Sequence, residues 1–150
     1  MNSSVNNSSD KILTVVPEGP IAFDGREYRY SKGEAIYLHN LARSFKKIRI
    51  AAYVLKKGDP FFESCIHSSL TSNKIEIIEL PSLSLEHQLN IFSKIKQFFQ
   101  VFKVLNRAID KETNLLYLFL PSYPSALAWI VNLIKKKKYF VYGADDWEQA

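Results

Sequence analysis

The sequence contains few of the residues on which metal and disulfide sites depend. Cys65 is the single cysteine among 150 residues, which excludes an internal disulfide and a cysteine-based zinc cluster and favours a reducing compartment. The three histidines, His39, His67 and His87, form no i,i+4 pair and have no cysteine partner. We therefore expect no metal site.

Glycine-rich phosphate motifs are missing as well. No P-loop is present, and no G-x-G-x-x-G follows the first apolar run, so a dinucleotide would lack the close backbone approach that its pyrophosphate needs. Ser122 lacks the G-x-S-x-G context of a hydrolase nucleophile. We expect no bound cofactor, and no sequence motif identifies a catalytic residue.

The chain also lacks a signal peptide and a continuous apolar span. Met1 to Asp10 are rich in serine and asparagine, which predicts a disordered tail before one domain at 11–150. The uncharged stretch Leu115 to Ile134 is long enough to cross a membrane, but Pro121 and Pro124 divide it into a buried strand and a helix. The net charge of +5 permits an anionic partner without requiring one.

Apolar runs and helical stripes alternate along the domain. We expect strands at 12–16, 48–54, 74–80, 115–120 and 139–142, and helices at 33–45, 85–109 and 126–135. This alternation predicts an α/β fold, doubly wound, with a mostly parallel sheet of about five strands in the order 3-2-1-4-5. Its crevice would lie at the ends of the first and fourth strands.

The longest expected helix carries both an apolar stripe and a basic border. Its stripe is expected to face the core and comprises Leu85, Leu89, Phe92, Ile95, Phe99, Phe102, Leu105 and Ile109. Phe98 widens the apolar face, and Lys94, Lys96 and Lys103 supply positive charge around it. The helix is therefore either a well-covered core helix or a contact with an anionic membrane surface.

Candidate ligand-binding residues follow the strands. Glu18, Gly19 and Arg26 belong to the loop after the first strand, which is either a surface loop or a cover over a ligand, and Tyr123 follows the fourth strand. The sequence 145–147 (Asp145, Asp146, Trp147) follows the fifth. An acidic pair beside tryptophan can bind a polyol, or its carboxylates can cap a helix.

Three segments carry a resemblance to a known family. Lys11 to Val16, the helix from Gly33 with its continuation to Ile50, and Tyr139 to Trp147 resemble the N-terminal, Rossmann-like half of GT-B glycosyltransferases, particularly family 4. The resemblance implies a three-layer α/β/α domain that binds the acceptor, while a second domain binds the nucleotide-sugar donor. It also implies transfer with retention and no metal.

The same resemblance implies where the acceptor would bind. The loop at Glu18, Gly19 and Pro20 would approach the acceptor and the donor phosphate, and the loop from Gly143 to Trp147 would border the acceptor. The sequence departs from the family pattern because Gly19 has no neighbouring glycine. The donor domain with its Glu-x7-Glu signature is absent from these residues.

Two functions are therefore expected from the sequence. The first is an acceptor-binding domain or fragment of a retaining glycosyltransferase, inactive alone, that acts on a saccharide or lipid-linked acceptor in the cytoplasm or at the inner face of the membrane. The alternative is a non-catalytic flavodoxin-like module that binds a ligand or partner. Nucleic acid is not an expected partner, because the lysine run at 135–138 has no interleaved aromatics.

Overall fold

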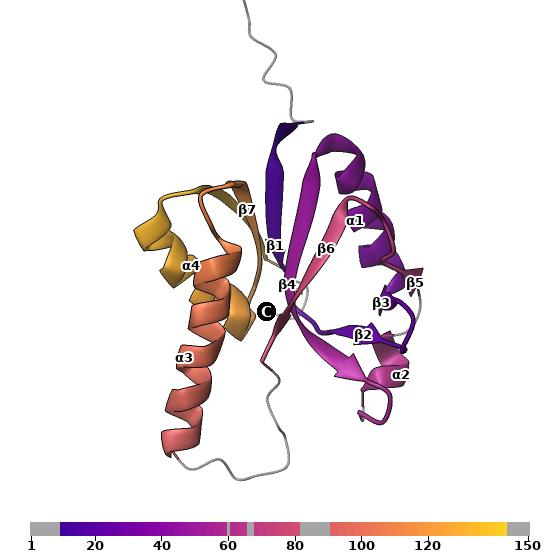
Figure 1. Ribbon diagram of the computed structural model, residues 1–150, viewed down its shortest axis with the longest axis horizontal. Coiled ribbons are helices and arrows are strands. Elements are labelled where there is room, and N and C mark those ends of the chain that lie inside the picture. The colour runs from indigo at the N-terminus through magenta and orange to yellow at the C-terminus, as the bar shows by residue number, and fades with distance from the viewer. Residues whose placement is uncertain (1–9, 60, 66–67, 82–90, 144–150) are drawn as a thin grey trace, which may run out of the picture.

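The computed structural model describes residues 10–59, 61–65, 68–81 and 91–143, which form four helices and eight strands (Figure 1). The strands are β1 (Ile12–Val16), β2 (Ile21–Phe23), β3 (Tyr28–Tyr30), β4 (Lys47–Lys56), β5 (Ser68–Ser69), β6 (Ile75–Leu80), β7 (Thr113–Leu120) and β8 (Lys138–Gly143). The helices are α1 (Lys32–Ser44), α2 (Phe62–Cys65), α3 (Ile91–Ala108) and α4 (Tyr123–Lys135). The fold is a Rossmann-like α/β fold, as the sequence predicts.

Five parallel strands form the main part of the sheet in the order β6-β4-β1-β7-β8. This is the predicted order 3-2-1-4-5. In the centre, Leu13 of β1 lies beside Ile48 of β4 on one side and Leu115 of β7 on the other. The β1 and β4 strands are largely buried, which explains why they contain apolar residues at successive positions rather than in alternation.

Three short strands extend the sheet beyond the five expected ones: β2 and β3 lie between β1 and α1, and β5 lies between α2 and β6. β2 pairs in parallel with the end of β4, β3 pairs antiparallel with β2, and β5 pairs antiparallel with β3. β2 and β3 thus form a hairpin. Its turn requires a glycine at position 25, because Gly25 has a φ of +95°, a region that side chains with a Cβ rarely adopt.

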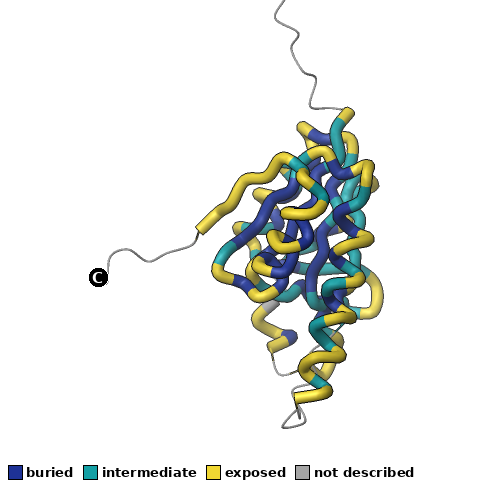
Figure 2. Tube along the Cα trace, turned by 90° about the vertical axis from the view of Figure 1, so that its left-hand side faces the viewer, coloured by how far each residue is buried: buried dark blue, intermediate teal, exposed yellow. Residues whose placement is uncertain are grey.

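Helices cover the two faces of the sheet. On the face that we call the α1 face, Ala35, Leu38 and Ala42 of α1 pack in a core with Leu13 and Val15. On the opposite α3/α4 face, a second core combines buried residues of α3 and α4 with the alternate side chains of the strands. Figure 2 shows the buried tube in the middle of the molecule and exposed tube on its outer helices and on β8.

The expected core-facing stripe of α3 is wrong for the first half of the helix. Phe92 is 77% exposed and Phe99 is 62% exposed, and the buried positions of α3 are Val101, Leu105 and Ala108. The reason is that the first turns of α3 extend past the carboxyl ends of the strands, where the sheet offers no surface to cover them (Figure 1). The expected start of this helix at residue 85 lies outside the described residues.

The uncharged stretch at 115–134 divides at its prolines, as expected. Its first part completes β7, and its second part forms nearly all of α4. Among the residues that the structure describes, no helix combines the length and the apolar character that crossing a membrane requires.

Candidate functional site

The carboxyl ends of β1 and β7 form the switch point of the sheet. The two strands are neighbours, with Val16 beside Leu118. After β1 the chain leads to α1 on one face, whereas after β7 it leads to α4 on the other. In open α/β sheets the crevice between two such connections is the usual place for a ligand.

Two serines join the walls of this crevice. Ser125 donates its hydroxyl to the carbonyl of Val16 at 3.0 Å, and Ser122 donates to the carbonyl of Pro17 at 3.4 Å. Ser122 is also the N-cap of α4, where its side-chain oxygen accepts a hydrogen bond from the backbone N–H of Ser125. Both serines are buried. These bonds fix the start of α4 against the loop after β1.

Three of the residues expected at the crevice lie there. Glu18 is exposed just after β1, and Tyr123, the first residue of α4, is 46% exposed. Gly19 is half-buried, and a Cβ built on it would meet only the hydroxyl of Tyr30, at an ordinary 3.9 Å. Neither packing nor backbone conformation therefore requires a glycine at position 19.

Tyr53 is a crevice residue that the sequence analysis missed. It lies near the carboxyl end of β4, and its buried hydroxyl has no hydrogen-bond partner among the described residues. Burial, with a smaller contribution from nearby Tyr123, raises the pKa of Tyr53 to about 12. A buried hydroxyl without a partner costs about 1–3 kcal/mol, so this group is available to a ligand that reaches it. The sequence offered only a weak signal, a tyrosine within the apolar run from Ile50 to Leu55.

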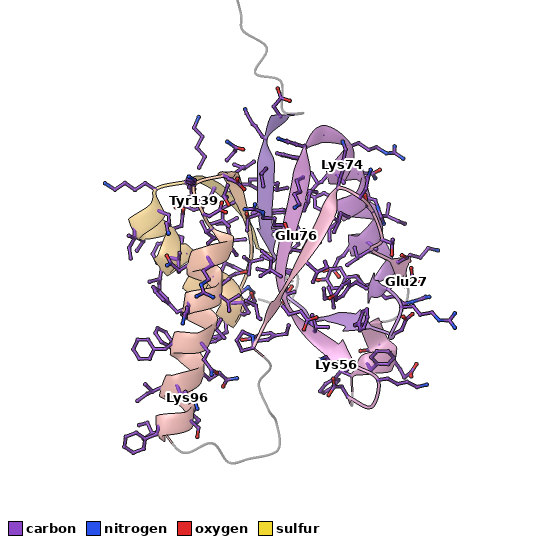
Figure 3. All side chains as sticks on the ribbon, in the orientation of Figure 1. Glu27, Lys56, Lys74, Glu76, Lys96 and Tyr139 are labelled. Carbon is purple, nitrogen blue, oxygen red and sulfur yellow. The ribbon has the colours of Figure 1, made fainter. Side chains whose placement is uncertain are left out.

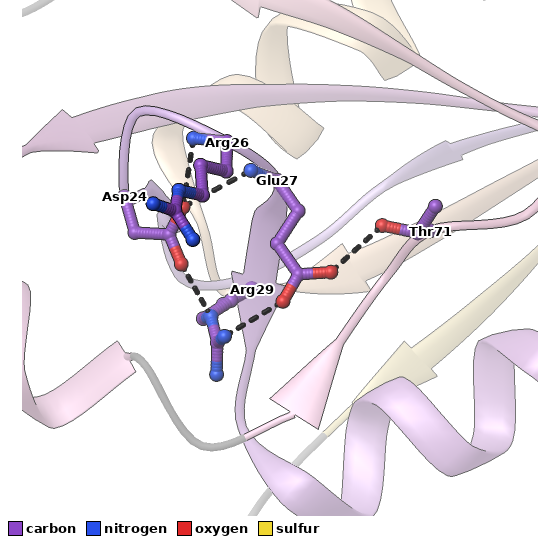
Figure 4. A pocket seen from close by; sticks show the side chains of 5 residues that line it. All are labelled: Asp24, Arg26, Glu27, Arg29 and Thr71. Atoms are coloured by element: carbon purple, nitrogen blue, oxygen red, sulfur yellow. Dashed lines mark hydrogen bonds and ion pairs between the residues drawn. The ribbon is translucent and has the colours of Figure 1, made fainter.

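Arg26 lies elsewhere. It lines an open pocket of about 600 Å³ with Asp24, Glu27, Arg29 and Thr71, and none of the other expected site residues belongs to that lining (Figure 4). The pocket sits on the β2–β3 hairpin beside β5. The structure therefore does not bring Arg26 together with Glu18 or Tyr123.

The charges in the hairpin pocket largely satisfy one another. Arg29 binds Asp24 and Glu27, each at 2.7 Å, and Glu27 also accepts hydrogen bonds from Ser69 at 2.6 Å and Thr71 at 3.1 Å. Hydrogen bonds from the backbone N–H groups of Glu27 and Arg26, and then from Arg29, lower the pKa of Asp24 to about 2. This network ties the hairpin to β5, and we interpret it as a structural connection.

Exposed basic and apolar side chains lie along α3, most of them in its first half beside the carboxyl edge of the sheet. Lys94, Lys96 and Lys103 are exposed, and Figure 3 shows Lys96 on the part of the helix that extends past the strands. Phe98 is half-buried against the core and stacks on Phe102. The exposed apolar residues are instead Ile91, Phe92, Ile95 and Phe99.

Asp145, Asp146 and Trp147 lie outside the described residues, so both roles for the acidic pair stay predictions. Among the residues that the structure describes, no three histidine, cysteine, aspartate or glutamate side chains gather in a way that could hold a metal ion.

Comparisons with known proteins add little. No protein-family model and no curated protein matches the chain. Two structures of the C-terminal domain of the PF1911 hydrogenase from Pyrococcus furiosus are similar to it. One, residues 78–226, is 9% identical with a TM-score of 0.46 and covers 91% of this chain and 95% of its own. The other, residues 83–215, is 8% identical with a TM-score of 0.47 and covers 95% and 98%.

Proposed function

We propose that the chain is the acceptor-binding domain of a retaining, GT-B-type glycosyltransferase that transfers a sugar from a nucleotide-sugar donor to a saccharide or lipid-linked acceptor. The observation that carries the proposal is the unpartnered hydroxyl of Tyr53 beside Tyr123 at the crevice. A tyrosine pair of this kind offers a hydrogen-bonding group and an aromatic surface, which together suit a sugar hydroxyl and the apolar face of its ring.

The donor would require residues that this domain does not provide. Glu18 is the charged residue next to the end of β1, and a carboxylate there repels a diphosphate rather than binding it. Gly19 shows no feature that would bring the backbone close to a phosphate. Because transition-state stabilisation needs the donor's diphosphate held in place, we propose that the chain alone binds acceptor without transferring sugar.

The proposed place of action is the cytoplasmic surface of an anionic membrane. Support comes from α3, whose exposed Phe92, Ile95 and Phe99 are bordered by exposed Lys96 and Lys103. Apolar residues with lysines at their border suit the interface between lipid chains and anionic headgroups. This surface lies at the same edge of the sheet as the crevice, so a lipid-linked acceptor could reach Tyr53 while its lipid stays in the membrane (Figure 1).

Acceptor binding is tested by saturation-transfer NMR with saccharides, a short polyprenyl phosphate and nucleotide sugars as probes. We expect an acceptor-type probe to bind the wild-type chain and nucleotide sugars not to bind. Tyr53→Phe should weaken that binding several-fold while raising the melting temperature, because the variant removes a buried hydroxyl without a partner.

The matched control is Tyr28→Phe, which removes a hydroxyl that donates to Glu79 at 3.0 Å. This control should leave probe binding unchanged. A folded wild-type chain that binds none of the probes would contradict the proposal and favour the alternative, a flavodoxin-like module that recognises a protein partner.

A further inference from the structure

Exposed apolar side chains concentrate at one edge of the sheet. Of the sixteen large hydrophobic residues that are exposed in the described part of the chain, nine lie on α4 and β8. They are Tyr123, Trp129, Ile130, Leu133, Ile134, Tyr139, Phe140, Val141 and Tyr142. The sequence from Tyr123 to Ile134 contains no charged residue, so α4 is uncharged until its last residue, Lys135.

β8 is an open edge strand. Within the described residues it pairs only with β7, and all six of its residues are exposed (Figure 2). Such an edge presents unpaired backbone N–H and C=O groups, which proteins ordinarily protect with charges, prolines or bulges. β8 has none of these after Lys138, and its register with β7 is regular over all six residues.

Both faces of β8 are apolar. Phe140 stacks on Tyr117 at a ring distance of 4.1 Å, and Tyr142 contacts Phe119 at 5.5 Å, which places these two rings on the α1 face of the sheet. Because side chains alternate along a strand, Tyr139 and Val141 lie on the α3/α4 face. A strand added to this edge would therefore bury apolar surface on both faces.

We propose that β8 pairs antiparallel with β8 of a second copy of this chain, which joins the two sheets into one continuous sheet around a two-fold axis. With the axis perpendicular to the sheet, the α1 faces of the two copies lie on the same side of the joined sheet. An even-numbered residue of one β8 strand then lies opposite an even-numbered residue of the other, and odd-numbered residues pair in the same way. Centring the pair on Val141 places Phe140 opposite Tyr142 of the second copy on the α1 face. The interface is then self-complementary, as a two-fold dimer requires.

Charge decides the strand direction. Lysines 135–138 stand at the amino end of β8. In a parallel pair these two clusters would lie together and repel one another. In the antiparallel pair they lie at opposite ends of the six-residue strands, about 20 Å apart at about 3.3 Å per residue.

The available surface is large enough for a stable dimer. The nine side chains are between 38% and 72% exposed. At about 150–250 Å² for a large side chain, they present on the order of 800 Å² per copy. Standard interfaces bury about 800 Å² per partner. On the α3/α4 face, α4 packs against β7, the neighbour of β8, so the α4 helices of the two copies would lie on either side of the junction.

Analytical ultracentrifugation of the full chain over a range of concentrations tests the pairing. We expect a dimer for the wild type and at least a tenfold weaker dimer for Val141→Lys, because two lysines would then face one another at the axis. Ile36→Lys is the matched control, since Ile36 on α1 is 53% exposed and lies away from β8, and it should leave dissociation unchanged.

Disulfide cross-linking tests the register. In a Cys65→Ser background, Val141→Cys should form a cross-linked dimer under mild oxidation, because opposite residues in an antiparallel pair have Cβ atoms about 5 Å apart. Tyr139→Cys should not, because its two copies would lie about 13 Å apart. Cys65→Ser alone should form the same non-covalent dimer as the wild type and no cross-linked dimer.

Either of two results would overturn the proposal. One is a wild-type chain that stays monomeric at high concentration, which would assign this edge to another protein, a further segment or lipid. The other is equal weakening by Val141→Lys and Ile36→Lys, or equal cross-linking at positions 139 and 141, which would indicate unspecific association.

Discussion

Arg49 shows how a single charged side chain organises the end of the sheet opposite the crevice. Its guanidinium, 13% exposed, contacts Asp110 at 2.9 Å, Glu112 at 2.6 Å and Glu76 at 3.3 Å. These partners come from β6 and from the turn between α3 and β7. Burial raises the pKa of Asp110, but the hydrogen bond and charge of Arg49 outweigh it and leave that pKa below its usual range.

Replacing this residue tests its role. Arg49→Ala should lower the free energy of unfolding by about 2 kcal/mol, because three carboxylates lose a hydrogen-bonded, charged partner at one position. The measurement is urea denaturation followed by circular dichroism. Arg43→Ala is the control, since Arg43 is an exposed residue in the last turn of α1 and should change stability by less than about 0.5 kcal/mol.

At the scale of one element, α3 shows where reasoning from the sequence succeeds and where it fails. Its helical period was recognised, and Leu105 faces the core as expected. Burial of Phe92, Ile95 and Phe99 was expected from the same period, but the sheet ends before these residues. A periodic stripe of apolar residues shows which residues share a face of the helix. It does not show how far the sheet that packs against that face extends.

The exposed half of α3 carries the membrane prediction. We expect the chain to co-sediment with phosphatidylglycerol vesicles and not with neutral phosphatidylcholine vesicles. The triple variant Lys94→Glu, Lys96→Glu, Lys103→Glu should reduce that binding at least tenfold, since each lysine near an anionic surface contributes about 1 kcal/mol.

A second triple variant distinguishes an effect of the charge on α3 from an effect of the net charge of the whole chain. Lys32, Lys46 and Lys57 are also exposed and lie outside α3, so replacing all three by glutamate changes the net charge equally. Binding should be much less affected in this control. If both triple variants lost binding equally, the attraction would come from net charge and the assignment to α3 would be wrong.

For the whole molecule, paired carboxylates determine how stability depends on pH. The pKa values of Asp24, Glu27, Glu76 and Asp110 all lie below their ordinary values in the folded chain. For Glu76 the first cause is the hydrogen bond from Lys47. A carboxyl with a lowered folded pKa stabilises the fold above its unfolded pKa, and this contribution is lost as pH falls through the folded pKa.

We therefore expect stability to be constant from neutral pH to about pH 5 and to fall between about pH 4 and pH 2. The lower limit follows from Asp24, whose pKa is about 2. Melting temperature measured against pH gives the curve. Asp24→Asn should make it less steep near pH 3, and an unchanged slope in that variant would show that the carboxylate of Asp24 does not contribute.

Some residues of the candidate site could be placed from the nearby sequence, and others depend on contacts between distant elements. Glu18 and Tyr123 could be placed at the crevice because each directly follows a predicted strand, and strand order fixes which strand ends are neighbours. Tyr53 could not, because its burial and its proximity to Tyr123 bring together β4 and the start of α4, which are far apart in the sequence. Arg26 was misplaced because the hairpin that carries it turns toward β5.

The sequence by itself determined the alternation of strands and helices and the parallel order of the five main strands. These features follow from short-range periodicity and from the handedness of crossovers, which act along neighbouring residues. Only the tertiary structure decided that β2, β3 and β5 extend the sheet and that, among the described residues, half of α3 is uncovered and β8 is an open apolar edge. Burial and pairing depend on where distant elements begin and end, and no local pattern in the sequence encodes that.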